Sequence, residues 1–184
     1  MVGELPDAAG VPGLAPNDGD GLVLVGPFAP SLAGSELAKQ RGELDQGLPQ
    51  VPLEDVSAAL ALVREIVRDG IASATHDVSD GGLACALAEM AIAGGVGLDV
   101  DLDPLVELRG GSGETCLFGE GPGGVVIAAA DPGALLERAG AAGVEAVEIG
   151  AVSGDRIEIA AAERDVSVAL ADAERAWRSL DQRL

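Results

Sequence analysis

The amino-acid sequence predicts a mixed α/β or α+β domain, and three observations support this prediction. Short apolar runs bounded by turn residues alternate with longer stretches in which apolar residues recur at helical spacing. Apolar residues make up 48% of the 184 residues, which is enough for a sizeable core. The aromatic residues are only Phe28, Phe118 and Trp177, so this core has to consist of aliphatic side chains.

The N-terminal region divides into a loop-like segment and the first predicted elements. Residues 1–20 are rich in proline and glycine and predict a loop, with a brief strand at residues 2–5. The apolar run of residues 21–27 is bounded by turn residues and predicts a strand. The stretch that follows predicts a short helix, with either Ser31 or Ser35 as its N-cap.

Residues 51–69 form the clearest predicted helix. Pro52 suits its first turn, and Glu54 and Asp55 follow where the helix dipole favours acidic side chains. Gly70 suits the position just after the helix. Apolar residues at helical spacing predict the buried stripe: Val56, Ala59, Leu60, Val63, Ile66 and Val67.

The centre of the chain predicts a strand, a helix and a second strand. Residues 71–75 can form a short strand. Ser79 is predicted to cap a helix that ends at about residue 93, with a buried face of Leu83, Leu87, Met90 and Ala91. Residues 96–102 alternate apolar and acidic residues, which predicts a half-buried strand with its acids outward.

The C-terminal half continues the alternation of elements. The sequence predicts a weak helix from Pro104, a short helix at residues 114–118, a turn at 119–124, a strand at 125–130, a helix at 131–142 capped by Asp131, and a strand at 144–152. Residues 153–155 predict a hairpin turn into a strand at residues 156–160. Residues 167–184 predict a final helix that carries Trp177.

Charge and cysteine content exclude several classes of protein. The formal net charge of -20 argues against nucleic acid and anionic membranes, because contacts with phosphate need clustered Lys and Arg. Cys85 and Cys116 lack metal-type spacing and are expected to be thiols in a reducing cytosol. The N-terminus does not resemble a signal peptide, and no apolar run approaches the roughly 20 residues of a membrane helix. We expect a soluble, cytoplasmic protein.

The stretch around the only histidine is the candidate site, a polar turn that leads into a predicted helix: His76, Asp77, Ser79, Asp80, Gly81 and Gly82. The first amides of a helix lack internal acceptors and carry partial positive charge, and glycines let a phosphate approach closely. Against an anion site, the two aspartates add negative charge. The alternative is an ordinary helix cap with close helix–strand packing and a locally bonded His76, and residue types alone favour it.

Other patterns with chemical meaning are weaker. A Ser-His-Asp triad is disfavoured because adjacent His76 and Asp77 point apart on a strand. Residues 119–124 match Gly-x-Gly-x-x-Gly, but a strand follows where a dinucleotide site needs a helix, so we expect a surface loop. Acidic side chains that could bind magnesium are better explained as a solvated strand face and turn: Asp77, Asp80, Asp99, Asp101 and Asp103. We assign no catalytic residue and no metal ligand.

One block of sequence resembles a known family. The run Thr-His-Asp-Val-Ser-Asp-Gly-Gly-Leu at residues 75–83, with the apolar helix after it, resembles the C-terminal domain of phosphoribosylformylglycinamidine synthase. Members of that family are the synthetase subunit of bacterial purine biosynthesis. Residues 2–9, 19–27, 33–39 and 117–121 resemble other segments of the family in the expected order. The resemblance covers nearly the whole chain.

The resemblance implies a particular fold and domain division. The implied fold is α+β, a two-layer mixed sheet with helices packed on one face, like the C-terminal domain of aminoimidazole ribonucleotide synthetase. Residues 21–184 would form this domain, and residues 1–20 would be the tail of a preceding ATP-type domain or a linker. Glu120 lies in the loop that resembles the family's Phe-Gly-Glu-Ser sequence and joins the candidate anion- or nucleotide-binding residues.

The resemblance also implies an ATP-dependent carbon–nitrogen ligase. In that family ATP activates the amide oxygen of formylglycinamide ribonucleotide, and glutamine-derived ammonia displaces the phosphate to give formylglycinamidine ribonucleotide, with magnesium required. The implied partners are the remaining domains of the synthetase chain, a glutaminase subunit and a small accessory subunit. The family's chain is several times longer and carries the catalytic histidine and most ATP and magnesium ligands elsewhere. We therefore expect no activity from these residues alone.

One departure and two alternatives bear on this interpretation. Where the family loop has serine and arginine after the glutamate, residues 121–124 are Gly-Pro-Gly-Gly, which argues against phosphate binding there. One alternative is a domain of a related ATP-using enzyme, such as aminoimidazole ribonucleotide synthetase, a selenophosphate synthetase or a hydrogenase maturation factor. The other is a non-catalytic module that packs against partner domains.

Overall fold

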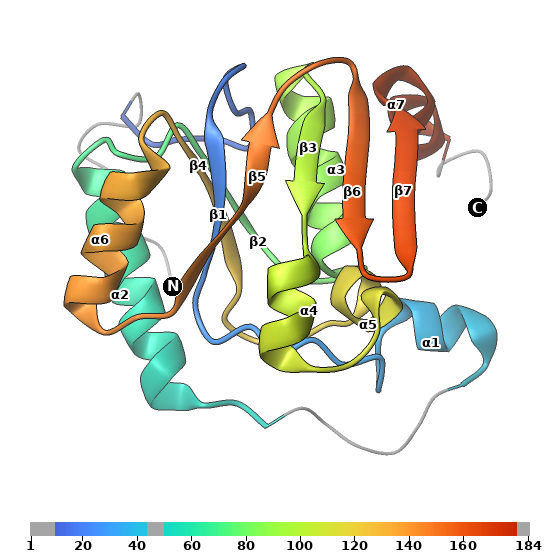
Figure 1. The fold of residues 1–184 in the computed structure, drawn as a ribbon, viewed down its shortest axis with the longest axis horizontal. Coiled ribbons are helices and arrows are strands. Elements are labelled where there is room, and N and C mark those ends of the chain that lie inside the picture. The colour runs from blue at the N-terminus through green and yellow to red at the C-terminus, as the bar shows by residue number, and fades with distance from the viewer. Residues whose placement is uncertain (1–9, 44–49, 180–184) are drawn as a thin grey trace.

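The fold is built around one mixed sheet of seven strands in the order β2-β4-β1-β5-β3-β6-β7 (Figure 1). The computed structural model describes residues 10–43 and 50–179. The strand expected at residues 2–5 lies outside this part of the chain. The strands are β1 Gly21–Val25, β2 Ala74–Asp77, β3 Leu98–Asp101, β4 Val125–Ala129, β5 Ala146–Val152, β6 Arg156–Ala161 and β7 Arg164–Ala169.

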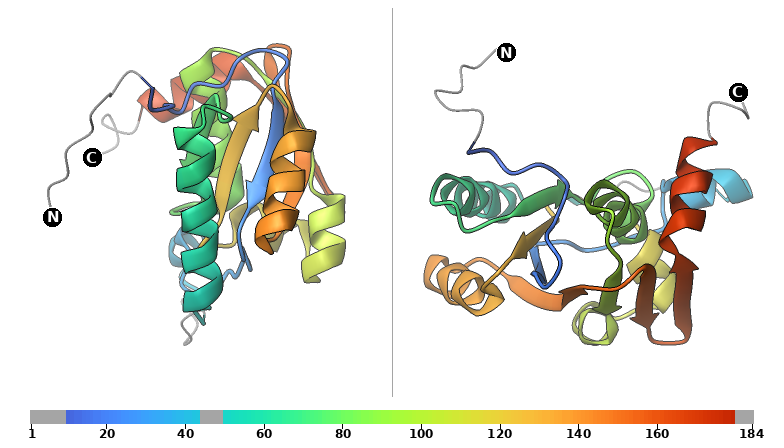
Figure 2. Two further views of the ribbon diagram at one scale, coloured as in Figure 1. Left: turned by 90° about the vertical axis from the view of Figure 1, so that its left-hand side faces the viewer. Right: turned by 90° about the horizontal axis from the view of Figure 1, so that it is seen from above.

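Helices cover both faces of the sheet at its β2-β4-β1 end. The helices are α1 Glu36–Arg41, α2 Leu53–Arg68, α3 Gly82–Gly94, α4 Asp103–Arg109, α5 Gly113–Phe118, α6 Pro132–Ala142 and α7 Leu170–Arg178. In the view from above in Figure 2, α2 and α6 lie together on one side of β1 and β4, and α3 lies on the other side. The predicted α+β class with a mixed sheet is confirmed, but the expectation of helices on one face only is corrected.

Two aliphatic clusters on opposite faces of the sheet explain this arrangement. Every residue of β1 and β4 is buried. Because successive side chains on a strand point to opposite faces, both faces of these strands have to be covered. Val23 and Ile127 pack with Ala59, Leu62 and Ile66 of α2 and with Leu135 of α6 in one cluster. Leu24 and Val126 belong to the other cluster, with Leu83, Leu87 and Met90 of α3.

The connection from β5 to β6 is not the predicted hairpin. Strand β3 lies between them, antiparallel to β5 and parallel to β6. Gly97, just before β3, makes this insertion possible, because it lies against the turn at residues 153–154 and forms two backbone hydrogen bonds with it. Its carbonyl accepts from the Ser153 amide at 2.9 Å, and its amide donates to the Gly154 carbonyl at 2.8 Å. A Cβ at residue 97 would lie 2.2 Å from the Arg156 carbonyl oxygen.

The predicted helix at residues 167–184 begins later than expected. Residues Arg164–Ala169 form strand β7, which pairs antiparallel with β6 through a tight turn at Ala162, where φ is 52°. Val166 and Val168 then lie opposite Ile159 and Ile157. Pairing with β6 decides the conformation of a stretch whose own pattern is ambiguous.

One detail of the helices differs from the expectations, and two agree with them. The buried stripe of α2 is Ala59, Leu62 and Ile66, whereas Leu60 is 44% exposed. The cap of α1 is Ser35, whose hydroxyl accepts from the Ala38 amide at 3.2 Å. The predicted buried face of α3 is confirmed.

Candidate functional site

The predicted polar turn connects the edge strand β2 to α3. His76 and Asp77 end β2, which is longer at its C-terminal end than the predicted strand, and Gly81 and Gly82 begin the helix. Both glycines have positive φ, 83° and 70°, a region that other residues rarely adopt. A Cβ on Gly82 would lie 2.7 Å from the Gly119 carbonyl oxygen and 2.8 Å from that of Leu117. The glycine pair therefore lets the turn pack closely against the loop after α5.

Ser79 is not the cap of α3. The N-cap is Gly81, in the left-handed conformation, and this glycine provides no side-chain capping bond. Ser79 contributes its carbonyl oxygen, which accepts from the Gly82 amide at 3.0 Å. The helix starts two residues later than a Ser79 cap requires, because the two glycines turn the chain before it enters the helix.

Glu120 places a carboxylate at this turn. Its Oε1 accepts from the Gly81 amide at 2.9 Å and from the Glu36 amide at 2.8 Å, so one oxygen binds the starts of α3 and α1 together. Its backbone exchanges two further hydrogen bonds with Ser31, at 2.9 and 3.1 Å. The position at which the sequence suggested an external anion is thus taken by a carboxylate of the chain itself.

His76 is tied to α3 rather than to a nucleophile. Its side chain is 11% exposed, and its Nε2 lies 2.7 Å from Oε2 of Glu89 on α3. Its Nδ1 lies 2.7 Å from the Asp77 carbonyl oxygen and 3.5 Å from that residue's Oδ1. The Asp77 carboxylate is largely exposed. The arrangement fastens strand to helix.

A surface groove of about 380 Å³ opens beside the turn. Four chain segments line it: residues 33–34 before α1, Val51 before α2, residues 78–80 before α3, and residues 120–122 before β4. Ser79, Asp80 and Glu120 of the candidate set therefore share one groove. His76, Asp77, Gly81 and Gly82 do not line it.

The loop after Glu120 has little room for side chains larger than glycine at residues 121 and 124. A Cβ on Gly121 would lie 2.6 Å from the Ala29 carbonyl oxygen. A Cβ on Gly124 would lie 2.9 Å from Cδ2 of Phe28, a residue that is fully buried. Phe28 thus fills the space against which a larger residue at position 124 would have to pack.

A magnesium-bound nucleotide at the turn would need metal ligands and free backbone amides. Within residues 10–43 and 50–179, no three His, Cys, Asp or Glu side chains lie close enough together to hold a metal ion. The carboxylate of Glu120 already bonds to the Gly81 amide, where a phosphate oxygen would have to bind.

Neither cysteine is activated as a nucleophile. Burial raises the pKa of the Cys116 thiol to about 11. Burial raises the pKa of the Cys85 thiol as well, and the charges of Glu89 and Glu120 add to this effect. A thiol with a raised pKa holds little thiolate at neutral pH.

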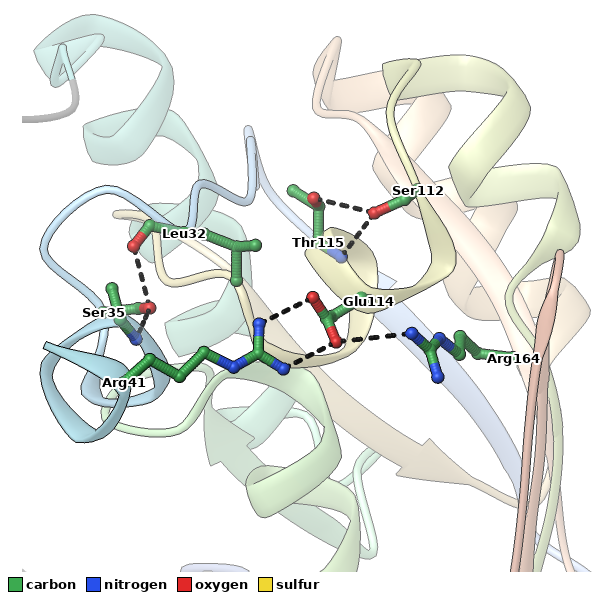
Figure 3. Close-up of polar contacts among 8 residues, drawn as sticks. Leu32, Ser35, Arg41, Ser112, Glu114, Thr115 and Arg164 are labelled. Carbon is green, nitrogen blue, oxygen red and sulfur yellow. Dashed lines mark hydrogen bonds and ion pairs between the residues drawn. The ribbon is translucent and has the colours of Figure 1, made fainter. Parts of the chain in front are cut away.

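A second polar cluster, which the sequence did not reveal, joins α1, α5 and β7 (Figure 3). Arg41 donates two hydrogen bonds of 2.9 Å to the carboxylate of Glu114, and Arg164 lies 3.7 Å from the same carboxylate. Hydrogen bonding to Arg41 is the main cause that lowers the pKa of Glu114. Three residues so far apart in sequence leave no local pattern that could have indicated the cluster.

Comparison with known proteins identifies the family. Residues 17–162 match the family described as AIR synthase related protein, C-terminal domain. The chain belongs to this family. The protein named phosphoribosylformylglycinamidine synthase subunit PurL from Moorella thermoacetica is 42% identical over 132 residues, and its namesake from Methanocaldococcus jannaschii is 35% identical over 137 residues. The resemblance seen in the sequence is thereby confirmed.

These matches cover a small part of each relative. Both cover 71% of this chain but only 17% and 18% of the relatives' own lengths. Among solved structures, Thermotoga maritima PurL complexed with FGAR has a TM-score of 0.73 at 17% identity, over 89% of this chain and 29% of that one. The hydrogenase maturation protein HypE from Escherichia coli has a TM-score of 0.59 at 19% identity, over 91% and 55%. Both structures share the fold of this AIR synthase related domain.

In the part of the chain that the structure describes, no helix combines the length and the apolar character that crossing a membrane requires.

Proposed function

We propose that this chain is the C-terminal domain of a phosphoribosylformylglycinamidine synthase, an ATP-dependent carbon–nitrogen ligase of purine biosynthesis. The complete enzyme would convert formylglycinamide ribonucleotide, ammonia from glutamine and ATP to formylglycinamidine ribonucleotide. One observation supports this above all: relatives with that name are 35 to 42% identical to this chain over 71% of its length.

In this proposal the domain contributes its surface and the rest of the enzyme contributes the cofactor sites. ATP and magnesium would bind mainly in preceding domains, because the described residues offer no metal cluster and the Gly81 amide is already bonded to Glu120. The partners would be those remaining domains, a glutaminase subunit and a small accessory subunit, and the site of action would be the cytoplasm. His76, Ser79 and Asp80 would border an interdomain surface. Residues 1–20 would lead in from the preceding ATP-type domain.

The proposal is tested by comparing the 184-residue chain with the same chain joined to the preceding domains. Each protein is incubated with formylglycinamide ribonucleotide, ATP, magnesium and ammonia, and substrate-dependent release of ADP is measured. We expect release only from the joined protein. Turnover by the isolated chain would contradict the proposed division of labour, and a joined protein that uses a different substrate would contradict the proposed reaction. The sequence of the preceding domains would also separate this enzyme from aminoimidazole ribonucleotide synthetase, selenophosphate synthetase and hydrogenase maturation relatives.

A second candidate is a non-catalytic module that only packs against partner domains. The carboxylate of Glu120 favours it, because this side chain supplies internally the anion that a nucleotide-binding turn would take from a ligand. Calorimetry with ADP and magnesium separates the two roles. Heat that disappears in Ser79→Ala would support a nucleotide site on this domain, whereas no heat would support the packing role.

A further inference from the structure

The groove beside the turn is a built feature of the fold. Its four lining segments come from different parts of the chain. Hydrogen bonds of Glu120 connect its own segment to the segments that precede α1 and α3. Oε1 of Glu120 holds the start of α1 and the turn before α3, and its backbone pairs with Ser31. The walls are thus held in place by hydrogen bonds that do not depend on any ligand.

The walls of the groove are mainly aliphatic. Val51 is 49% exposed although it lies on the wall, and Pro122 and Ala33 face the same space, while Val78 is buried beneath it. Exposed aliphatic side chains in a concave surface mark sites of contact with another apolar group. Ser79, with its exposed hydroxyl, is among the few polar side chains there.

The charged side chains that line the groove are the acids Asp80 and Glu120, and Lys39 is the cation whose charge acts on both of them. Asp80 is exposed on the rim, and among the described residues no lysine or arginine forms an ion pair with it. Lys39 is paired instead with Glu36, at 3.0 Å. The second oxygen of Glu120, Oε2, forms no hydrogen bond with any other residue that the structure describes. The groove therefore favours a cation over an anion.

We propose that this groove binds a polypeptide segment from outside these 184 residues, in which one arginine or lysine side chain is flanked by aliphatic residues. The aliphatic part would cover Val51 and Pro122, and the cationic head would reach Asp80, as long basic side chains do when their stem lies on apolar surface. A phosphate is disfavoured, since two carboxylates flank the space. This inference concerns the surface alone and does not depend on which reaction the complete enzyme performs.

The test uses the 184-residue protein and a blocked pentapeptide, alanyl-leucyl-arginyl-valyl-alanine amide. Nuclear magnetic resonance follows the amide signals of the protein during titration. We expect saturable shifts confined to the groove segments, with a Kd on the order of 1 mM, typical of a short peptide with few contacts. The matched probe replaces arginine by citrulline, which has nearly the same shape but no charge, and should bind about threefold more weakly.

Substitutions test the two walls separately. Asp80→Asn should weaken binding of the arginine peptide about threefold and remove the preference over the citrulline peptide. Val51→Ser should weaken both peptides about fivefold, because it exposes less aliphatic surface to cover. Both residues are exposed, so neither change threatens the fold. Asp155→Asn is the matched control, since Asp155 is an exposed acid in the turn between β5 and β6, and it should leave both affinities unchanged.

Three results would overturn the inference. They are equal binding of the arginine and citrulline peptides, shifts scattered over the acidic surface, and no saturation up to about 10 mM peptide. A parallel titration with inorganic phosphate serves as the competing arm. If phosphate moves the signals of residues 78–82 and the arginine peptide does not, the groove is an anion site and the proposal is wrong.

Discussion

The two halves of the sheet differ in how many of their faces are covered. In β1 and β4 every residue is buried, because α2 and α6 cover one face and α3 covers the other. In β3 burial alternates strictly, with Leu98 and Val100 inside and Asp99 and Asp101 exposed. Strand β7, at the far edge, has no fully buried residue.

This difference indicates which positions of the sheet tolerate substitution and where functional side chains can lie. A strand covered on both faces has no position for a polar side chain, so its chemistry has to lie at its ends. The groove and the polar turn lie where β2 ends and β4 begins, at the end of the doubly covered half. The half that is covered on one face carries acidic residues outward along its strands.

The largest expected effect is the loss of a core side chain from the doubly covered half. Ile127→Ala in β4 should lower the free energy of unfolding by about 4 kcal/mol, because Ile127 is fully buried against α2 and α6. Its neighbour Val126 faces α3, and Val126→Ala should lower it by about 2 kcal/mol. Urea denaturation measures both.

The control lies in the other half of the sheet. Glu158 in β6 is exposed between buried Ile157 and Ile159, so Glu158→Ala should change stability by no more than about 0.5 kcal/mol. If Val126→Ala or Ile127→Ala were equally neutral, the corresponding face of β4 would not be covered as described.

The next effect concerns the glycine pair at the polar turn. Gly82→Ala should destabilise the protein by about 3 kcal/mol, because a Cβ meets the carbonyl oxygens of Leu117 and Gly119 and the backbone keeps a positive φ. Gly154→Ala is the matched control, with φ at 73° and open space around it. It should cost only about 1 kcal/mol. Equal losses would show that close packing at Gly82 contributes nothing.

A smaller effect is expected from the carboxylate that binds two helix starts. Glu120→Ala should lower the free energy of unfolding by about 2 kcal/mol, because the amides of Gly81 and Glu36 lose their acceptor. Glu120→Gln keeps an acceptor oxygen and should lose about half as much. Hydrogen exchange should be faster at both amides in Glu120→Ala. Unchanged exchange at these amides would contradict the role of Glu120 in holding the two helix starts. An equal loss of stability in Glu107→Ala, at an exposed residue, would contradict it as well.

The smallest effect concerns the ion pair that ties α1 and α5 to the edge of the sheet. Two hydrogen bonds from Arg41 lower the pKa of Glu114 below its ordinary value of 4.5. A depressed pKa in the folded state adds stability above the unfolded-state pKa, and this stability is lost as the pH falls through the folded-state pKa. Glu114→Gln should therefore melt at a lower temperature than the original protein at neutral pH, and this difference should disappear as the pH falls through the lowered pKa of Glu114.

The pair is exposed and screened by salt, so the difference at neutral pH should be small and should shrink further in high salt. A difference that persists unchanged at low pH would mean that Glu114 acts through packing rather than through its charge.

Much of the fold could be predicted because its signals are local. The continuous apolar run of residues 125–129 predicted β4, and the spacing of Leu83, Leu87 and Met90 predicted the buried face of α3. The alternation in residues 96–102 predicted which side of β3 faces water. In each case the periodicity of side chains along one element carries the information.

The predictions were wrong where contacts between residues far apart in sequence determine the local conformation. The hairpin expected after β5 failed because β3 inserts between β5 and β6, and no signal within residues 153–155 reports a strand that ends more than fifty positions earlier. Residues 167–169 were predicted as the start of a helix but form the end of β7, because pairing with β6 outweighs the helical pattern that follows. Ser79 looked like a cap, yet the close approach of residues 117–119 requires the two glycines to turn the chain first.

The candidate site shows the same division. By itself the sequence determined that residues 75–83 form a polar turn before a buried helix, and that this block belongs to one family of domains. It could not determine what binds the amides of the turn. Only the tertiary structure decided this, because the carboxylate at the Gly81 amide comes from Glu120, 39 positions away. The periodicity of a helix can be read from neighbouring residues in the sequence, whereas the partner of a backbone amide depends on which distant loop the fold places beside it.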